Sequence, residues 1–251
     1  MFRLRYLFIV GPFALVSASI ALGQSTRSVE EQFAGYQRQL SVKADDVLAA
    51  PKLYAEEAGR SGTAQLSGAK NSAVNFNTAL GRVQQLRPLL EPILREQGVP
   101  TDLAAVVLVE SGGRPTALSP KGALGLWQLM PETARRYGLT VTPDKDDRTD
   151  LTKSTQAAAR YLRDLHAQFG DWQLAFAAYN AGEQAVHQAM LRTGSSEFTG
   201  LSALLPSETR AYVPAVMTAL PLFGRAKEYS VATLQTARRA HVLYASAQLE
   251  N

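Results

Sequence analysis

The position of greatest chemical interest in this chain is Glu110, which follows an unbroken run of apolar residues, 103–109. Gly112 and Gly113 come soon after it, and glycine disfavours the continuation of a helix. Such a run is typical of a short helix buried on all sides, so we expect Glu110 at its end to be partly buried. Burial and the negative end of the helix dipole both raise the pKa of a carboxyl group. Glu110 is therefore a candidate general acid, and the alternative is a buried carboxylate in a structural ion pair with an arginine.

A second group of candidate residues lies in the segment 117–131, shortly after Glu110. Gly122 and Gly125 allow the backbone to approach a ligand closely, because they carry no Cβ atom. The side chains of this segment combine hydrogen-bonding groups with apolar surface, which suits a sugar chain; they are Ser119, Trp127, Gln128 and Met130. The alternative interpretation is a tight structural turn with Trp127 in the core.

The third group is the segment 177–182, Ala-Ala-Tyr-Asn-Ala-Gly, in which Tyr179 and Asn180 stand at the predicted end of a helix. Side chains at a helix end can point into a cleft, and the small residues around them permit close packing. Taken alone, the same sequence is also an ordinary helix stop, because glycine is common just after a helix.

The elements that must position these groups are predicted to be helices. From about residue 73 onward, apolar residues recur at helical spacing, and we find no clear period-two alternation. Pro88 and Pro92 are expected to limit the first helix, with Pro88 in the first turn of a second one that ends at Gly98. Thr101 is expected to cap the helix that leads to Glu110.

Further boundaries are predicted along the rest of the chain. They are Pro131 and Gly138 for a short helix, Thr152 or Ser154 and Gly170 for a long one, Asp171 and Gly182 for the next, and Ser207 for the last core helix. The sequence thus predicts an all-α domain of about 150 residues, in which 112–130 is the long irregular stretch. Long ordered loops in compact domains are usually functional.

The composition excludes several classes of site and partner. The chain of 251 residues has 26 basic and 22 acidic side chains, a net charge of +4, and no basic block with interleaved aromatic residues, so we expect no nucleic-acid partner. It contains no cysteine, which excludes disulfides, thiolate metal sites, cysteine nucleophiles and a lipidated cysteine anchor. The three histidines are scattered, and we predict no metal site.

The chain divides into four predicted segments. Residues 1–23 resemble a secretory signal, with Arg3 and Arg5 before an apolar stretch and small residues at Ala21 and Gly23; the alternative is an uncleaved membrane anchor. Residues 24–72 are predicted to be a flexible linker or a weakly helical segment. Residues 73–225 form the predicted domain, and 226–251 a C-terminal extension. Export follows from the first segment, to the periplasm or, in a cell with a single membrane, to the exterior, with no stable membrane span after signal cleavage.

The order of the motifs resembles the lysozyme-like domain of soluble-type lytic transglycosylases. The resemblance rests on Glu110-Ser111, Ser119, Gly122-Ala123, Gly125-Leu126-Trp127-Gln128 and the segment 178–182. Further stretches resemble the membrane-bound lytic transglycosylase D branch, and they are 98–100, 147–150, 154–158, 169–172 and 205–214. The similarity covers roughly 85–222, without the LysM repeats and lipid anchor that are common in that branch.

The resemblance implies a lysozyme-like all-α fold with a substrate cleft, and an enzyme that acts on peptidoglycan glycan strands. Such enzymes cut the bond between N-acetylmuramic acid and N-acetylglucosamine without water, need no cofactor, and leave 1,6-anhydromuramic ends. Glu110 would be the sole catalytic acid and base. By the same matching, the substrate-binding residues would be Ser119, Gln128, Met130, Tyr179, Asn180 and Tyr212. Ser111 is expected to support the loop, and Asp147, Arg148 and Asp150 to form a structural ion network.

Two alternatives remain open at this point. A hydrolase of the goose-lysozyme kind would share the architecture, but ordinary glycosidases usually need a second carboxylate about 5–10 Å from the first. The segment around Glu110 offers none: Asp102 lies two helical turns away, and the cluster 144–150 lies in a polar connector. A catalytically inactive glycan-binding scaffold is the other alternative. The protein partners are not predicted.

Overall fold

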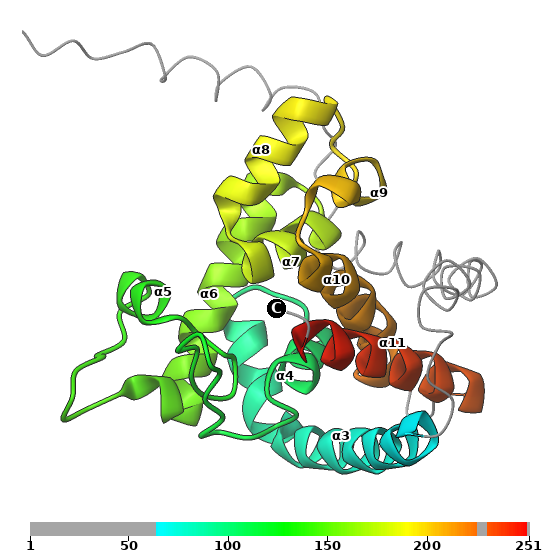
Figure 1. The fold of residues 1–251 in the computed structure, drawn as a ribbon. Coiled ribbons are helices and arrows are strands. Elements are labelled where there is room, and N and C mark those ends of the chain that lie inside the picture. The colour runs from blue at the N-terminus through cyan, green and yellow to red at the C-terminus, as the bar shows by residue number, and fades with distance from the viewer. Residues whose placement is uncertain (1–63, 225–229, 250–251) are drawn as a thin grey trace, which may run out of the picture.

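The computed structural model describes residues 64–224 and 230–249, and these residues form an all-α fold (Figure 1). No strand occurs among them, and three isolated bridges, between 118 and 124, 124 and 129, and 141 and 146, are the β-type pairings they contain. The predicted all-α class is thus confirmed. The predicted signal, 1–23, and most of the predicted linker lie outside the described residues. No helix within the described part of the chain has the length and apolar character to cross a membrane.

The short helix α4 (Ala104–Glu110) lies in the interior, where α3 (Ala64–Glu96) and α10 (Ser207–Ala219) pack against it. Every residue of the apolar run 103–109 is buried, as the sequence predicted. The 3-10 helix η1 (Thr101–Leu103) precedes α4, so Thr101 belongs to a helical turn and the predicted Thr101 cap is wrong. Burial of the whole segment, rather than a capping side chain, therefore fixes where α4 begins.

The helix α3 continues through Pro88 and Pro92 to Glu96, so the predicted division at these prolines is wrong. A proline within a helix removes one backbone hydrogen bond, and here tertiary contacts hold the helix on both sides of that loss. Leu90 and Leu94 are fully buried. On another face, Gln84 and Arg87 donate to the carbonyl groups of Leu222 and Phe223, at 3.0 and 3.1 Å. The helix ends, as predicted, before Gly98, which has a positive φ of 73°.

The remaining helices follow the predicted order. They are α5 (Pro131–Arg136), η2 (Asp147–Thr149), α6 (Leu151–Phe169), α7 (Trp172–Ala181), α8 (Glu183–Thr193), α9 (Phe198–Leu201), η3 (Ser202–Leu204), α10 and η4 (Leu220–Leu222). Asp171 caps α7, as expected, by accepting from the backbone NH of Leu174 at 2.9 Å. The cap of α6 is Asp150 rather than Thr152 or Ser154, and it accepts from the NH of Lys153 at 2.8 Å. An aspartate is at least as good a cap as a serine or threonine, so the start of α6 moves to Leu151.

A last helix, α11 (Val231–Leu249), occupies most of the predicted C-terminal extension. It packs against α10 and α3, and Figure 1 shows it in red between these two helices, with one end near α4. Ala237 and Tyr244 on this helix are buried. The helix was not predicted as part of the core, because its apolar residues form no continuous stripe in the sequence.

Candidate active site

Glu110 lies at the C-terminal end of α4, where the buried helix meets the irregular segment 111–130. It is half-buried, and its Oε1 atom accepts a hydrogen bond of 2.6 Å from the hydroxyl of Tyr212. Burial raises the pKa of Glu110 from 4.5 to about 8; the Tyr212 hydrogen bond opposes this rise, and the negative charge of Glu208 adds to it. The carboxyl group therefore holds its proton at neutral pH. No ion pair to an arginine involves Glu110 among the described residues, so the general-acid interpretation fits better than a structural ion pair.

Tyr212 reaches Glu110 from the middle of α10, and its side chain is fully buried. Burial, and the nearby charge of Glu110, raise the pKa of the Tyr212 hydroxyl well above its usual value, so this hydroxyl is a donor at any physiological pH. One phenol thus fixes one oxygen of the Glu110 carboxyl group.

Tyr179, near the end of α7, does not bond to Glu110 directly. Its hydroxyl donates to the backbone carbonyl of Trp127 at 2.7 Å, which ties α7 to the irregular segment. Its ring contacts Tyr161 at 5.2 Å between centroids, and Tyr161 contacts Tyr137 at the same distance. The charge of Glu110 contributes to the raised pKa of Tyr179, which indicates that the two groups are close.

Trp127 is a core residue, and the interpretation of its ring as a sugar-binding surface is wrong. Its side chain is fully buried, and its indole NH donates to the Thr155 hydroxyl at 2.9 Å. Ser111, beside Glu110, is also buried and donates to the Leu126 carbonyl at 2.7 Å, in the supporting role that the sequence analysis expected. Trp127 and Ser111 therefore anchor the irregular segment beneath the candidate site.

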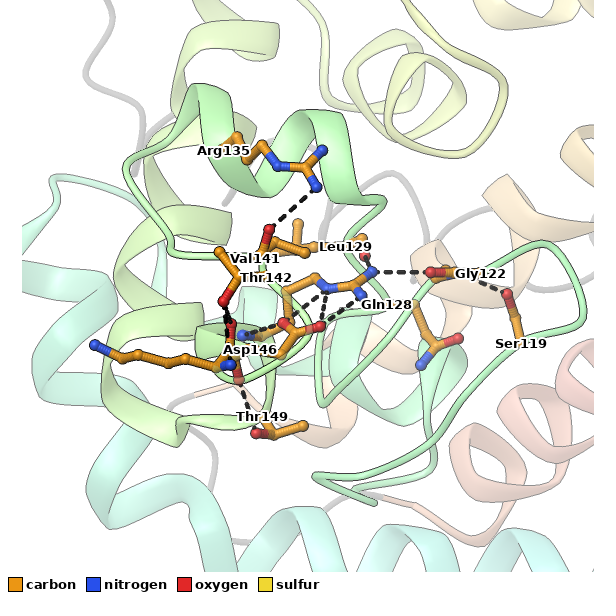
Figure 2. A network of polar contacts seen from close by, with 12 residues as sticks. Ser119, Gly122, Gln128, Leu129, Arg135, Val141, Thr142, Asp146 and Thr149 are labelled. Carbon is orange, nitrogen blue, oxygen red and sulfur yellow. Dashed lines mark hydrogen bonds and ion pairs between the residues drawn. The ribbon is translucent and has the colours of Figure 1, made fainter.

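Arg148 holds the same segment from its far side. This buried side chain donates to the carbonyl groups of Gly122 and Leu129, at 2.8 and 3.0 Å, and pairs with Asp146 at 2.7 Å. Figure 2 shows Asp146 at one side of the guanidinium and Gly122 and Leu129 at the other. Gly125 has a φ of 87°, and a Cβ atom there would lie 2.0 Å from the Arg148 carbonyl oxygen. A glycine is therefore required at 125 by the approach of protein backbone, not by the approach of a ligand.

Three predicted substrate-binding residues lie in or beside this segment. The Ser119 hydroxyl accepts from the NH of Ala123 at 3.0 Å. Gln128 has a φ of 48° and donates through its side-chain NH₂ to the carbonyl groups of Ala117 and Gly125, at 2.8 and 2.9 Å. Both residues are labelled in Figure 2, near Gly122. Met130 directly precedes α5 and is 43% exposed, so its thioether is available to a ligand.

Asn180, the remaining predicted binding residue, is joined to α10. Its Oδ1 atom accepts from the hydroxyl of the buried Thr209 at 2.7 Å. Thr209 adjoins Glu208, and the Glu208 carboxylate pairs with Lys121 at 2.9 Å. The first turn of α10 therefore connects to the irregular segment on one side and to α7 on the other.

Glu208 is the residue that the sequence analysis missed. It influences the pKa of Glu110 from another helix, 98 positions later in the chain, and so brings a second carboxylate into the neighbourhood. The sequence did contain a signal for Glu208. This residue lies in the stretch 205–214 and precedes Tyr212 by one helical turn.

The acidic residues 146, 147 and 150 have structural roles, but the ion pairs differ from the expected network: Arg148 pairs with Asp146 rather than with Asp147 or Asp150. Asp147 accepts from Lys153 at 2.8 Å and from the NH of Thr140 at 3.0 Å, and these bonds lower its pKa. Asp150 caps α6. Among the described residues, no group of three or more His, Asp or Glu side chains is arranged to hold a metal ion.

Comparison with known proteins finds a family similarity for part of the chain. Residues 89–201, less than half of the chain, match the profile of the transglycosylase SLT domain. This match agrees with the resemblance of the motifs within those residues. Tyr212 and α11 lie beyond the matched residues.

Two relatives show how far the similarity extends. The chain is 38% identical over 143 residues to membrane-bound lytic murein transglycosylase D of Escherichia coli (strain K12), which covers 55% of this chain and 31% of the relative. It is 37% identical over 120 residues to membrane-bound lytic murein transglycosylase F of Salmonella typhi, which covers 43% of this chain and 24% of the relative. The matched region thus spans about a third or less of each relative's length.

Among solved structures, an inactive variant of the lytic transglycosylase Slt of Pseudomonas aeruginosa aligns with 53% of this chain and 23% of its own. The sequence identity is 31% and the TM-score is 0.46.

Proposed function

We propose that this protein is a peptidoglycan lytic transglycosylase with Glu110 as its single acid and base. It would cleave the β-1,4 bond between N-acetylmuramic acid and N-acetylglucosamine without water and leave a 1,6-anhydromuramic end. The SLT domain and the names of the relatives support this substrate class. The observation that carries the proposal is the Glu110 carboxyl group at the end of a buried helix, bonded to the Tyr212 hydroxyl at 2.6 Å, where burial raises its pKa to about 8.

In the first step, Glu110 donates its proton to the glycosidic oxygen, and the bond between C1 of the muramic residue and that oxygen breaks. A raised pKa suits this step, because a general acid must still be protonated at the working pH. The Tyr212 hydroxyl, at 2.6 Å, then bonds to the carboxylate that forms. That bond is stronger to an anion than to a neutral acid, so it stabilises the state reached after proton transfer.

In the second step, the Glu110 carboxylate takes the proton of the C6 hydroxyl of the same sugar while the C6 oxygen bonds to C1. The proton given in the first step leaves on the hydroxyl of the departing sugar, and the C6 proton replaces it, so Glu110 is regenerated. The nucleophile is already part of the substrate, so its effective concentration is high and no residue is needed to activate water.

The polar groups around Glu110 suit an N-acetylated sugar chain. Gln128 and Asn180 use one end of each carboxamide for internal hydrogen bonds, to Ala117 and Gly125 and to Thr209. Each carboxamide is thus oriented by the protein, and its other end is the natural group to bind a substrate amide. Ser119 and the exposed Met130 would contribute a hydroxyl and an apolar contact.

A hydrolase is the second candidate, and Glu208 is the observation that favours it. An inverting or retaining glycosidase uses a second carboxylate as base or nucleophile. Glu208 lies close enough to raise the pKa of Glu110, although its own carboxylate is held by Lys121 at 2.9 Å. Because the Glu208 carboxylate is already occupied by Lys121, the single-carboxylate route is favoured.

The test is a digest of purified sacculi in water enriched in heavy oxygen, followed by mass analysis of the fragments. The lytic transglycosylase should give anhydro ends without solvent oxygen, and Glu208→Gln should retain most of this activity. Reducing ends that carry heavy oxygen, together with loss of activity in Glu208→Gln, would establish the hydrolase instead. A parent protein that binds sacculi but releases no fragments would support the inactive scaffold.

The site of action would be the peptidoglycan compartment, reached by export through the predicted signal at residues 1–23. Fractionation of cells that express the full chain, with detection of the N-terminal residue of the mature protein, tests this. Protein that stays in the cytosol with residues 1–23 intact contradicts the proposed location.

A further inference from the structure

The C-terminal helix α11 lies outside the residues that match the SLT domain. It is nevertheless connected to the candidate catalytic residue Glu110 through one side chain, that of Tyr212. Tyr244, on α11, packs its ring against Tyr212 with a centroid separation of 5.2 Å and an interplanar angle of 65°. Tyr212 in turn donates to Glu110 at 2.6 Å. Tyr212 and Tyr244 are 0% and 2% exposed, so water has no access to the contact between their rings.

Tyr212 depends on such a contact for its orientation. A tyrosine ring can swing about two side-chain torsions, and a hydrogen bond is lost when the hydroxyl moves by about an ångström. Edge-to-face packing of aromatic rings stabilises one relative orientation by about 0.5–1.5 kcal/mol beyond simple burial. Tyr244 supplies a contact of this kind to the Tyr212 ring.

Tyr244 is itself fixed by two features of α11. Its hydroxyl accepts a hydrogen bond of 2.7 Å from the side-chain NH₂ of Gln248, one turn later. Earlier in the helix, the His241 ring contacts Phe76 on α3 at 5.3 Å between centroids. The helix is thus docked against α3 on one face and against α10 on another, and Tyr244 is not free to leave Tyr212.

The ionisable groups around Glu110 come from each element that packs near it. α10 contributes Tyr212 and Glu208, α7 contributes Tyr179, and α11 contributes Tyr244. On α3, the Arg82 guanidinium donates to the Gly112 carbonyl at 2.8 Å, so its positive charge lies against the irregular segment 111–130. Among these groups, Tyr212 is the one with a hydrogen bond to the carboxyl group, and it is the one that Tyr244 touches.

We propose that α11 belongs to the catalytic machinery and that Tyr244 is a positioning residue, whose ring holds Tyr212 on Glu110 and excludes water behind the carboxyl group. The inference that this affects catalysis rests on the proposed function, whereas the effect on Glu110 itself does not. The part of the chain beyond the SLT match would then set the protonation state of the catalytic acid.

The test compares Tyr244→Ala, Tyr244→Leu and Tyr244→Phe with Leu243→Ala, a matched control at the neighbouring position, where the side chain is 42% exposed. The first readout is the infrared carbonyl band of protonated Glu110, identified by its absence in Glu110→Gln, and followed against pH without substrate. In Tyr244→Ala and Tyr244→Leu, water should enter and the midpoint of the Glu110 titration should fall toward its ordinary range. Burial is the largest cause of the raised pKa, so its loss outweighs the loss of the Tyr212 hydrogen bond, which alone would raise the midpoint. Tyr244→Phe and Leu243→Ala should keep the midpoint of the parent.

The second readout is the pH profile of sacculus digestion. The alanine and leucine variants should lower kcat about ten- to a hundredfold with a smaller change in KM, and should shift the alkaline limb in the same direction as the titration. If Tyr244→Ala fails to fold, Tyr244→Leu alone tests the positioning role of Tyr244.

An unchanged Glu110 midpoint in a folded leucine variant overturns the positioning role. Equal effects of Tyr244→Phe and Tyr244→Leu also overturn it, because the hydroxyl rather than the ring would then be responsible. If the midpoint shifts as expected but the parent protein releases no anhydro ends, the positioning role stands and the proposed function fails.

Discussion

Two carboxylate-bearing regions of this molecule differ in what surrounds them. Glu110 sits at the end of a buried helix with one hydrogen-bond donor, and its pKa rises to about 8. Asp146 and Asp147 sit in the connector beneath the 111–130 segment, where Arg148 and Lys153 pair with them and lower their pKa values. The same chemical group is thus kept neutral in one region and ionised in the other.

The comparison teaches that partners, more than burial alone, separate a reactive acid from a structural one. Asp147 is largely covered, with 8% of its side chain exposed, yet it remains ionised because a cation and a backbone NH satisfy it. No cation in the described part of the chain pairs with Glu110, so burial dominates its pKa. The first region can exchange a proton, and the second holds the loop that carries the binding residues.

The largest expected effect is that of Glu110→Gln, which should reduce sacculus lysis by about a thousandfold or more, because a neutral amide cannot donate and retrieve a proton. Stability should be unchanged or slightly higher, since the amide avoids the burial of a carboxyl group. The measurements are lysis of sacculi and thermal unfolding. Asp146→Asn is the matched control in the structural region, where stability should fall and residual activity should follow the folded fraction. Full lysis by Glu110→Gln would remove the assignment of Glu110.

The next effect concerns the structural region alone. Gly125→Ala should destabilise the fold by about 3 kcal/mol or more, because the new methyl group meets the Arg148 carbonyl oxygen at 2.0 Å and the backbone φ is unfavourable for alanine. Gly122→Ala is the control, since its φ of 88° is similar but no atom lies within 4 Å of the added Cβ. Chemical denaturation of both variants isolates the cost of the clash. Equal losses in the two variants would mean that backbone strain, and not the Arg148 contact, requires glycine at 125.

A smaller effect is expected from Tyr212→Phe, which removes the hydroxyl donor from Glu110 while leaving the ring in place. That hydrogen bond lowers the pKa of Glu110, so its loss should move the alkaline limb of the pH profile upward. The value of kcat should fall about ten- to a hundredfold, because the carboxylate formed in the first step loses its donor. A profile of activity against pH checks both. A downward shift of the limb would contradict the assigned direction of the Tyr212 contact.

The smallest effect is on the pH dependence of stability. Because the pKa of Glu110 is higher in the folded state than its ordinary value of 4.5, its contribution is fully present below that value and is lost as pH rises toward about 8. Asp147 behaves oppositely, because its pKa is lowered in the folded state and its contribution is lost in acid. Unfolding free energies of the parent and Glu110→Gln should therefore diverge as the pH rises between these two values. Parallel curves would indicate that Glu110 is ionised in the folded protein.

The sequence predicted the parts of this site that depend on local pattern. The apolar run 103–109 predicted a buried helix ending at Glu110, and Asp171, Gly98 and Pro131 marked helix boundaries that the structure confirms. The prolines in α3 misled the prediction, because contacts made by Gln84 and Arg87 with the distant 222–223 segment stabilise the helix across them. No local signal contains those contacts.

The sequence by itself determined that one carboxyl group would lie at the end of a short apolar helix. An unbroken apolar run followed by glycines predicts a short buried helix, whatever that helix packs against. The tertiary structure decided what that acid touches. Tyr212 on α10 bonds to it, Glu208 on α10 acts on it through its charge, and Tyr244 on α11 is connected to it through Tyr212, about a hundred residues or more further along the chain. Trp127 likewise turned from a candidate ligand surface into core. The physical reason is that hydrogen bonding, charge and solvent exclusion act through space over a few ångströms, whereas sequence patterns report neighbours along the chain.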